Sequence, residues 1–159
     1  MQDKNLPLVT IVIPCYNHSQ FIQQSIQSIV EQTYDNIELI VIDDGSQDKS
    51  VEKITELVAL CEKRFKRFKF ISRENKGLSA TLNEGLFLST GIYWAICSSD
   101  DYYHKDKINS QIKFFIENPD VKFCITGLYV VDDLDNVLVQ QTMNYNSYQK
   151  LDLSFENIF

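Results

Sequence analysis

The stretch VTIVIPCYNHSQFIQQSIQSIVEQTYDNIELIVIDDGS (residues 9–46) predicts two buried strands joined by a helix. Residues 8–17 are rich in β-branched apolar side chains and are ended by Pro14, which is typical of a strand buried on both faces. From Ser19 the apolar residues recur at helical spacing, with Gln and Glu on the other face. A second apolar run at 37–42 then breaks into a turn at 43–46. The stretch therefore predicts a strand–helix–strand unit.

The rest of the chain continues this alternation. Further strands are expected at 68–77, 92–99 and 122–131, the last turning at 132–140 into a sixth strand that forms a hairpin with it. Further helices are expected at 77–89 and 106–117, and after Asp48, where the apolar stripe contains Val51, Ile54, Leu57, Val58 and Cys61. Strands that alternate with amphipathic helices predict an α/β fold with a mostly parallel sheet covered on both faces.

The composition fits one globular domain over residues 1–159, with 44% hydrophobic and 23% charged residues. The net charge of −7 argues against a nucleic-acid partner, because phosphate-backbone binding depends on basic residues. An acidic protein that handles phosphates needs a metal ion or local basic groups.

The cysteines and the chain start predict a soluble cytoplasmic domain. Cys15, Cys61, Cys97 and Cys124 lie far apart and lack metal-ligand spacing. Cys97 and Cys124 lie in apolar runs, so both are expected in the core of a protein kept reduced. The start MQDKNLPLV lacks the apolar segment of a signal peptide, and no apolar run is long enough to span a bilayer.

The polar residues of interest follow the expected strands, at 15–18, 43–46 and 98–103. In parallel α/β sheets ligands bind beyond the carboxyl ends of the strands, so these three segments are expected at one edge. Asp100 and Asp101 are adjacent there, and two carboxylates about 4 Å apart repel by roughly 1 kcal/mol in water and about 4 kcal/mol near a protein surface. A divalent cation would offset this repulsion. The alternative is a solvated turn with helix-capping aspartates.

Because the common phosphate-binding and nucleophile motifs are missing, the aspartate pairs are the remaining candidates for the functional site. The chain lacks a GxGxxG fingerprint, a P-loop and a GxSxG elbow, and its two histidines, His18 and His104, are interpreted as loop residues. The acid pairs 43–44 and 100–101 suit Mg²⁺ or Mn²⁺, which bind through one or two carboxylates and substrate phosphates. The expected ligand is a diphosphate. A third pair, Asp132–Asp133, is interpreted as turn chemistry.

Residues 8–135 resemble the family-2 glycosyltransferases of the GT-A fold. The likeness rests on the opening block at 9–50 and on ENKGLSATLNEGLFLSTGIYWAICSSDD (residues 74–101), which has the spacing of the family's DxD-type metal motif. It implies a Rossmann-like domain that binds a nucleotide sugar, a UDP-sugar, through Mn²⁺ or Mg²⁺. The sugar would pass with inversion to a hydroxyl of a carbohydrate or lipid-linked acceptor, in polysaccharide or glycoconjugate synthesis. It also allows peripheral association of the full-length protein with the inner face of the membrane.

The resemblance implies residue roles at the nucleotide. Pro14, Tyr16 and Asn17 match the loop that lies against the base, and Asp44 matches the acid that holds the uracil ring. A carboxylate accepts an N–H, so Asp44 would favour a base that presents one. The alternative for the pair 43–44 is a capped turn ahead of the next helix, and one of the two acids is expected to do that.

At the diphosphate, Asp101 matches the metal-binding acid and Asp100 the neighbour that faces the ribose or the donor sugar. Many relatives carry an arginine where this chain has Leu82, so neutralisation is expected to shift to the metal or to Lys76. A block flanking the donor pocket is matched by Asn75, Gly77, Asn83 and Gly85, although both glycines could equally serve close helix–sheet packing.

The catalytic residues are not assigned. The family's general base lies on the acceptor side, and the late acids Asp132, Asp133, Asp152 and Glu156 lie in no recognisable base motif, so the base is expected beyond Phe159. We therefore expect the donor-binding part of a GT-A domain, truncated before the acceptor half, with little or no transfer by this chain alone. Two alternatives remain open: a non-catalytic nucleotide-binding module of the same fold, and another Mg²⁺-dependent phosphate enzyme on a doubly wound sheet.

Overall fold

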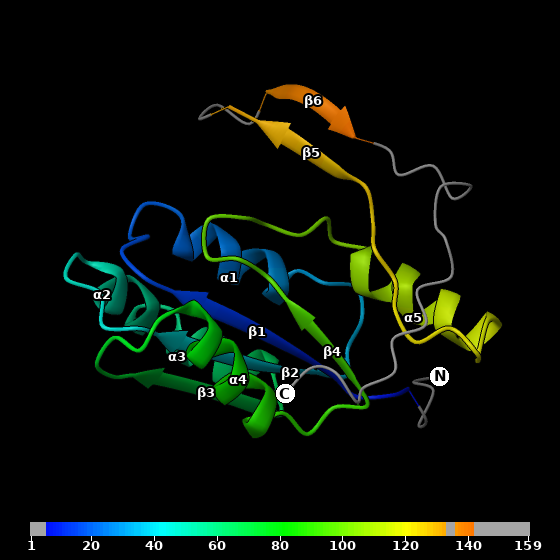
Figure 1. Cartoon of the computed structure of the whole chain (residues 1–159), viewed down its shortest axis with the longest axis horizontal. Coiled ribbons are helices and arrows are strands. Elements are labelled where there is room, and N and C mark those ends of the chain that lie inside the picture. The colour runs from blue at the N-terminus through cyan, green and yellow to red at the C-terminus, as the bar shows by residue number, and fades with distance from the viewer. Residues whose placement is uncertain (1–5, 133–135, 142–159) are drawn as a thin grey trace. The chain divides into compact units, whose positions relative to one another are not determined.

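Four parallel strands form the larger sheet of this computed structural model, which describes residues 6–132 and 136–141. The strands are β1 (Val9–Cys15), β2 (Ile37–Asp43), β3 (Arg67–Ser72) and β4 (Tyr93–Ile96), in the order β3-β2-β1-β4 (Figure 1). β1 and β2 are central and buried along their whole length, which explains their nearly continuous apolar sequence. The parallel register pairs Val9 with Ile37 at one end and Cys15 with Asp43 at the other.

Helices cover both faces of this sheet, as the sequence predicts. Side chains of α1 (Ile22–Val30), α2 (Ser50–Thr55), α3 (Val58–Arg64) and α5 (Lys107–Glu117) share one core cluster with alternate residues of β1 and β2. The opposite face has a smaller cluster, in which Val12 and Ile40 pack with Leu88 of α4 (Leu78–Leu88). The residues of the first cluster include Ile11, Ile13, Ile26, Ile29, Leu39, Val41, Ile54, Cys61, Ile108 and Ile112.

Close packing explains why residue 85 is a glycine, whereas Gly77 has a different reason. A Cβ atom on Gly85 would lie 2.6 Å from Val12 Cγ1, so α4 approaches β1 only because this residue lacks a side chain. Gly77, in contrast, has open space around it and a φ of +86°, which L-residues rarely adopt. It precedes α4 as the N-cap residue.

Several expected elements are wrong in extent. The strands expected at 68–77 and 92–99 end earlier, at Ser72 and Ile96. The helix expected after Asp48 is split into α2 and α3, because the N–H of Leu57 bonds to the carbonyl of Ile54 and tightens the chain into a 3₁₀-type turn. The strand expected at 122–131 is reduced to β5 (Leu128–Val131). A strand needs a hydrogen-bonded neighbour, and no strand in the described ranges pairs with residues 122–127.

The chain divides into two compact units, Met1–Asn118 and Pro119–Phe159. In the second unit β5 pairs antiparallel with β6 (Val137–Gln141), which confirms the expected hairpin. The carboxylate of Asp132 accepts bonds from the N–H and the side-chain amide of Asn136 at 2.9 and 3.0 Å, so this acid does serve the turn. Asp133, Asp152 and Glu156 lie outside the described residues.

The cysteines follow the sequence expectation with one exception. All four are free, and Cys15, Cys61 and Cys97 are buried. Cys124, which was expected in the core, is only partly buried because it lies in the irregular segment before β5. No helix within the described ranges is long and apolar enough to cross a membrane.

Candidate functional site

The segments that follow β1 and β2 are tied together at the carboxyl edge of the sheet. The N–H of Asp44 donates to the carbonyl of Cys15 at 2.8 Å. Asn17 has a φ of 55°, in the left-handed region that asparagine tolerates better than most residues. Its N–H donates to Ser46 Oγ at 2.9 Å, and its side-chain Oδ1 accepts from the N–H of Gln47 at 2.8 Å.

His18 connects the same loop to the segment that follows β4. Its backbone N–H donates to Ser50 Oγ at 3.0 Å, while its Nδ1 shares a hydrogen bond of 2.7 Å with Ser99 Oγ. Nδ1 also lies 3.9 Å from Asp100 Oδ1. Three segments far apart in the sequence therefore meet at one edge, and this expected convergence is confirmed.

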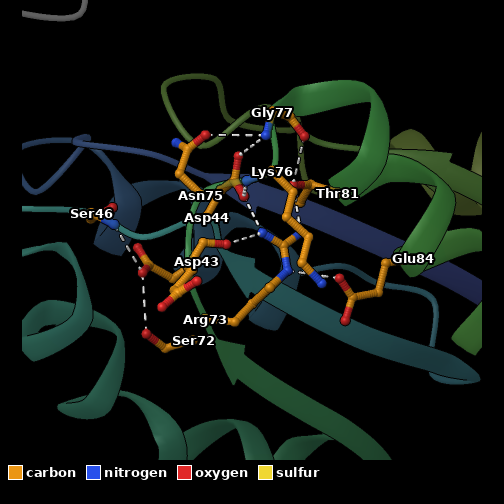
Figure 2. Close-up of polar contacts among 11 residues, drawn as sticks. Asp43, Asp44, Ser46, Ser72, Arg73, Asn75, Lys76, Gly77, Thr81 and Glu84 are labelled. Carbon is orange, nitrogen blue, oxygen red and sulfur yellow. Dashed lines mark hydrogen bonds and ion pairs between the residues drawn. The ribbon is translucent and has the colours of Figure 1, made fainter.

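Asp43 is the acid that caps the turn after β2. It is fully buried, and its Oδ2 accepts from the N–H of Ser46 at 3.1 Å and from Ser72 Oγ at 3.2 Å (Figure 2). Asp48 stabilises the start of α2, because its carboxylate accepts bonds from the hydroxyl of Ser50 and from the N–H groups of Ser50 and Ser19. Partial desolvation opposes ionisation of Asp48, but these hydrogen bonds, the one from the Ser50 hydroxyl above all, outweigh it and lower its pKa to about 2.

Asp44 holds a network of donors instead of capping the turn. Its side chain is buried, with the residue 5% exposed, and it forms an ion pair with Arg73 (Figure 2). Oδ1 also accepts from the N–H of Lys76 at 2.8 Å, and Oδ2 accepts from the N–H of Gly77 at 2.9 Å. Burial raises the pKa of this carboxyl, but the bonds from Lys76 and Arg73 more than compensate and keep the pKa below its ordinary value.

Arg73 is the residue that the sequence analysis missed. Besides Asp44 it contacts Glu84 of α4, with Nε to Oε2 at 2.8 Å, and Thr81 Oγ1 at 2.8 Å. Burial alone would lower its pKa, but the hydrogen bonds to Glu84 and Asp44 raise it, so the guanidinium stays charged. The sequence analysis placed Arg73 inside the strand expected at 68–77, whereas β3 ends at Ser72, so Arg73 follows the strand and lies at the carboxyl edge.

The remaining residues of the donor block lie beside this network. Asn75 Oδ1 accepts from the N–H of Gly77 at 3.1 Å, which stabilises the turn before α4. Lys76 is exposed, so its backbone contacts Asp44 while its ammonium is accessible to solvent. Asn83 is exposed on α4, and Leu82, the residue that replaces the family's arginine, is partly buried.

The residues expected near the base occupy different environments. Tyr16 is 45% exposed and lies just beyond the strand. Pro14 is inside β1, buried and paired with Ile42, and the strand continues to Cys15, so the loop begins at Tyr16, two residues after Pro14. The side-chain Oδ1 of Asn17 accepts the hydrogen bond from the N–H of Gln47 described above.

Asp100 and Asp101 lie exposed in a loop whose two flanks are anchored to α1. Ser25 Oγ donates to the carbonyl of Ser98 at 3.1 Å, and Ser28 Oγ accepts from the N–H of Tyr103 at 3.0 Å. The N–H of Asp101 closes the turn by bonding to the Ser98 carbonyl at 3.1 Å. The side chains of Asp100 and Asp101 are therefore exposed to solvent on a loop that hydrogen bonds from α1 hold at both ends.

A hard divalent ion fits this pair of acids. Exposed carboxylate oxygens are the ligands that Mg²⁺ and Mn²⁺ prefer. Within the part of the chain that the structure describes, no group of three or more His, Cys, Asp or Glu side chains could hold a metal ion. An ion bound here would therefore need oxygens from water or from a substrate to complete its coordination.

Comparison with known proteins gives a consistent result. The family described as Glycosyl transferase family 2 matches residues 10–158. A protein of Haemophilus influenzae, described as an uncharacterised glycosyltransferase, is 41% identical over 114 residues, which cover 72% of this chain and 44% of that protein. The chain thus spans less than half the length of this curated relative.

Two solved structures are similar in fold. Staphylococcus aureus TarS 1–349 in complex with UDP superposes with a TM-score of 0.63 at 22% identity, over 70% of this chain and 33% of that one. The mannosyltransferase PcManGT of Pyrobaculum calidifontis, in complex with GDP-Man and Mn²⁺, gives a TM-score of 0.67 at 24% identity, over 77% of this chain and 36% of that one. These likenesses establish the GT-A fold.

Proposed function

The chain belongs to glycosyltransferase family 2, and from this premise we propose that it binds a UDP-sugar at the carboxyl edge of the four-stranded sheet. The sugar is then transferred, with inversion, to an acceptor hydroxyl. The proposal includes a carbohydrate or lipid-linked acceptor in polysaccharide or glycoconjugate synthesis, and a cytoplasmic location.

One observation supports this proposal above the others. The buried Asp44 network and the exposed acids at 100–101 are joined through Asn17 and His18, whose contacts reach the segments after β2 and β4. Such a surface suits a nucleotide diphosphate, because it offers polar groups for the base at one side and exposed acids that could hold a cation for the phosphates at the other.

At the base, Asp44 is proposed to accept an N–H of the uracil ring. Its Oδ1 already accepts from Arg73 and from the N–H of Lys76, its Oδ2 accepts from the N–H of Gly77, and the hydroxyl of Thr81 also interacts with this carboxyl. These contacts keep Asp44 charged and fixed in position, which suits an acceptor for an N–H group. Pro14, Tyr16 and Asn17 are proposed to line the same side.

At the diphosphate, Asp101 is proposed to hold Mn²⁺ or Mg²⁺, and Asp100 to face the ribose or donor sugar. When bound, the ion supplies positive charge that neutralises the leaving diphosphate. The exposed ammonium of Lys76 is proposed to add a second positive charge from the turn before α4. The general base that takes the proton of the acceptor hydroxyl is proposed to lie beyond Phe159 in the longer proteins of this family.

Calorimetric titration of UDP into the chain, with Mn²⁺ or with EDTA, tests the proposal. We expect Asp101→Asn to weaken binding in Mn²⁺ by at least about tenfold, because even indirect metal contacts are worth that much. Asp120→Asn, a matched loss of an exposed acid in the other unit, should bind like the wild type. UDP binding that is equally tight in EDTA would contradict the metal-dependent donor site. Failure to bind UDP at all would contradict the proposed function.

A further inference from the structure

We propose that His18 is a positioning residue that fixes the segment 99–101, and with it the metal-binding acid, relative to the nucleotide-binding loops. The inference rests on the proposed function for the role of Asp101. The contacts of His18 themselves are independent of that function, because they join residues of this chain only.

His18 is held in place before it contacts the acidic loop. Its N–H is anchored to Ser50 Oγ at the start of α2, and its ring meets the ring of Phe21 edge to face, with the centroids 6.3 Å apart. The imidazole is partly buried, with 36% of the side chain exposed. A ring fixed by the backbone on one side and by an aromatic neighbour on the other can define the position of its hydrogen-bond partner.

The hydrogen-bond partner of His18 is Ser99, a buried residue of the acidic loop (residues 98–103). Ser99 is 2% exposed, whereas the side chain of Asp100 is 50% exposed and Asp101 is also exposed. Ser25 and Ser28 of α1 anchor the two flanks of the loop, at Ser98 and Tyr103. The bond from His18 anchors a residue between them, two positions before Asp101.

At a metal site with few protein ligands, the position of each exposed acid depends on the residues that hold its loop in place. Functional side chains must be held to within about 0.5 Å of the productive geometry by the residues behind them. The 2.7 Å contact between Nδ1 and Ser99 Oγ joins positions 81 residues apart, so it fixes the spacing between two loops that belong to different strands. Loss of the contact should loosen the metal-binding side of the site and leave the Asp44 side unchanged.

The test uses the whole chain and two readouts. His18→Leu removes the ring nitrogen, His18→Asn keeps a polar atom close to the Nδ1 position, and Ser99→Ala removes the partner from the other side. His104→Leu is the matched control, because the side chain of His104 is 74% exposed and its ring contacts Asp106 at the start of α5, not Ser99. Amide hydrogen exchange without ligand reports the order of residues 98–103, and UDP titration with Mn²⁺ and with EDTA reports the two sides of the site.

We expect His18→Leu and Ser99→Ala to speed exchange at 98–103 and to weaken Mn²⁺-dependent UDP binding by about tenfold, the usual effect of losing support behind a metal ligand. Binding in EDTA, and exchange in β1 and β2, should stay at wild-type values. His18→Asn should recover most of both losses, and the double variant His18→Leu/Ser99→Ala should lose no more than either single one.

Unchanged exchange at 98–103 in both single variants would overturn the inference, as would an equal loss of UDP binding in Mn²⁺ and in EDTA. If His18→Leu loses protection throughout β1 and β2, Ser99→Ala and His18→Asn decide the question. If the wild type itself fails to bind UDP, the proposed function is wrong, while the exchange data still show whether His18 orders the loop.

Discussion

Asp44 connects the end of β2 with the end of β1 and with the segment that follows β3 at the carboxyl edge. It joins β2 to the guanidinium of Arg73 and to two N–H groups of the turn before α4. Its neighbour Asp43 has an almost identical position in the sequence, but it caps the turn through Ser46 and Ser72. Adjacent acids therefore have separate tasks, because successive residues at a strand end point to opposite faces of the sheet.

Replacement of Asp44 by Asn should destabilise the chain as well as weaken UDP binding. The loss of the charge leaves Arg73 with Glu84 as its anionic partner, and a disturbed charged hydrogen bond in a buried site costs about 1–3 kcal/mol. Urea unfolding measures the change in the free energy of unfolding. Glu84→Gln is the control and should cost less, because the Glu84 side chain is more exposed than that of Asp44. Equal costs for the two variants would contradict the central role of Asp44.

Asp48 should make stability depend on pH in the acid range. Its pKa is lowered from 3.8 to about 2 in the folded chain, so the folded state favours the carboxylate. The stabilisation is complete above the ordinary pKa and is lost as the pH falls from about 4 through about 2. The free energy of unfolding, measured from pH 5 to pH 2, should fall less steeply with decreasing pH in Asp48→Asn than in the wild type. An identical slope would show that the capping bonds do not favour the charged form.

At the scale of secondary structure, the contact between α4 and β1 depends on one missing side chain. Gly85→Ala would place a Cβ 2.6 Å from Val12 Cγ1, so the helix or the strand must shift. We expect a loss of about 1–3 kcal/mol in the free energy of unfolding, as for other overpacked cores. The double variant Gly85→Ala/Val12→Ala should lose less than the sum of the two single variants, because Val12→Ala removes the clashing methyl groups. A stabilised Gly85→Ala variant would show that α4 does not approach β1 this closely.

At the scale of the whole molecule, the core should protect three of the four thiols. Cys15, Cys61 and Cys97 are buried, and burial raises the pKa of Cys61 to about 11 and of Cys97 to about 12. Cys124 is only partly buried. A thiol reagent at pH 8 should therefore modify Cys124 first and the others only as the chain unfolds. Cys124→Ser should remove the fast phase, and a fast phase that survives would mean that the core opens more readily than its packing suggests.

The sequence alone predicted the features that depend on neighbours along the chain. The apolar runs of β1 and β2 and the helical spacing of α1 identified these elements, and the rule for parallel sheets brought the segments after β1, β2 and β4 to one edge. The same rule did not reach Arg73, because the strand expected at 68–77 contained this residue and its sequence context has no motif that singles it out. The strand expected at 122–131 was too long, since apolar composition alone does not supply a hydrogen-bonded partner.

Only the tertiary structure decided which polar groups pair with one another. It placed β4 beside β1 and connected His18 to Ser99 across 81 positions. It also showed that Asp43 caps the turn after β2, whereas Asp44 accepts hydrogen bonds from the turn before α4. The reason is physical: periodicity records which face a side chain buries, and this is a local property of the chain. Hydrogen bonds between distant loops depend instead on strand order and on the register of the sheet, which emerge only when the whole core packs.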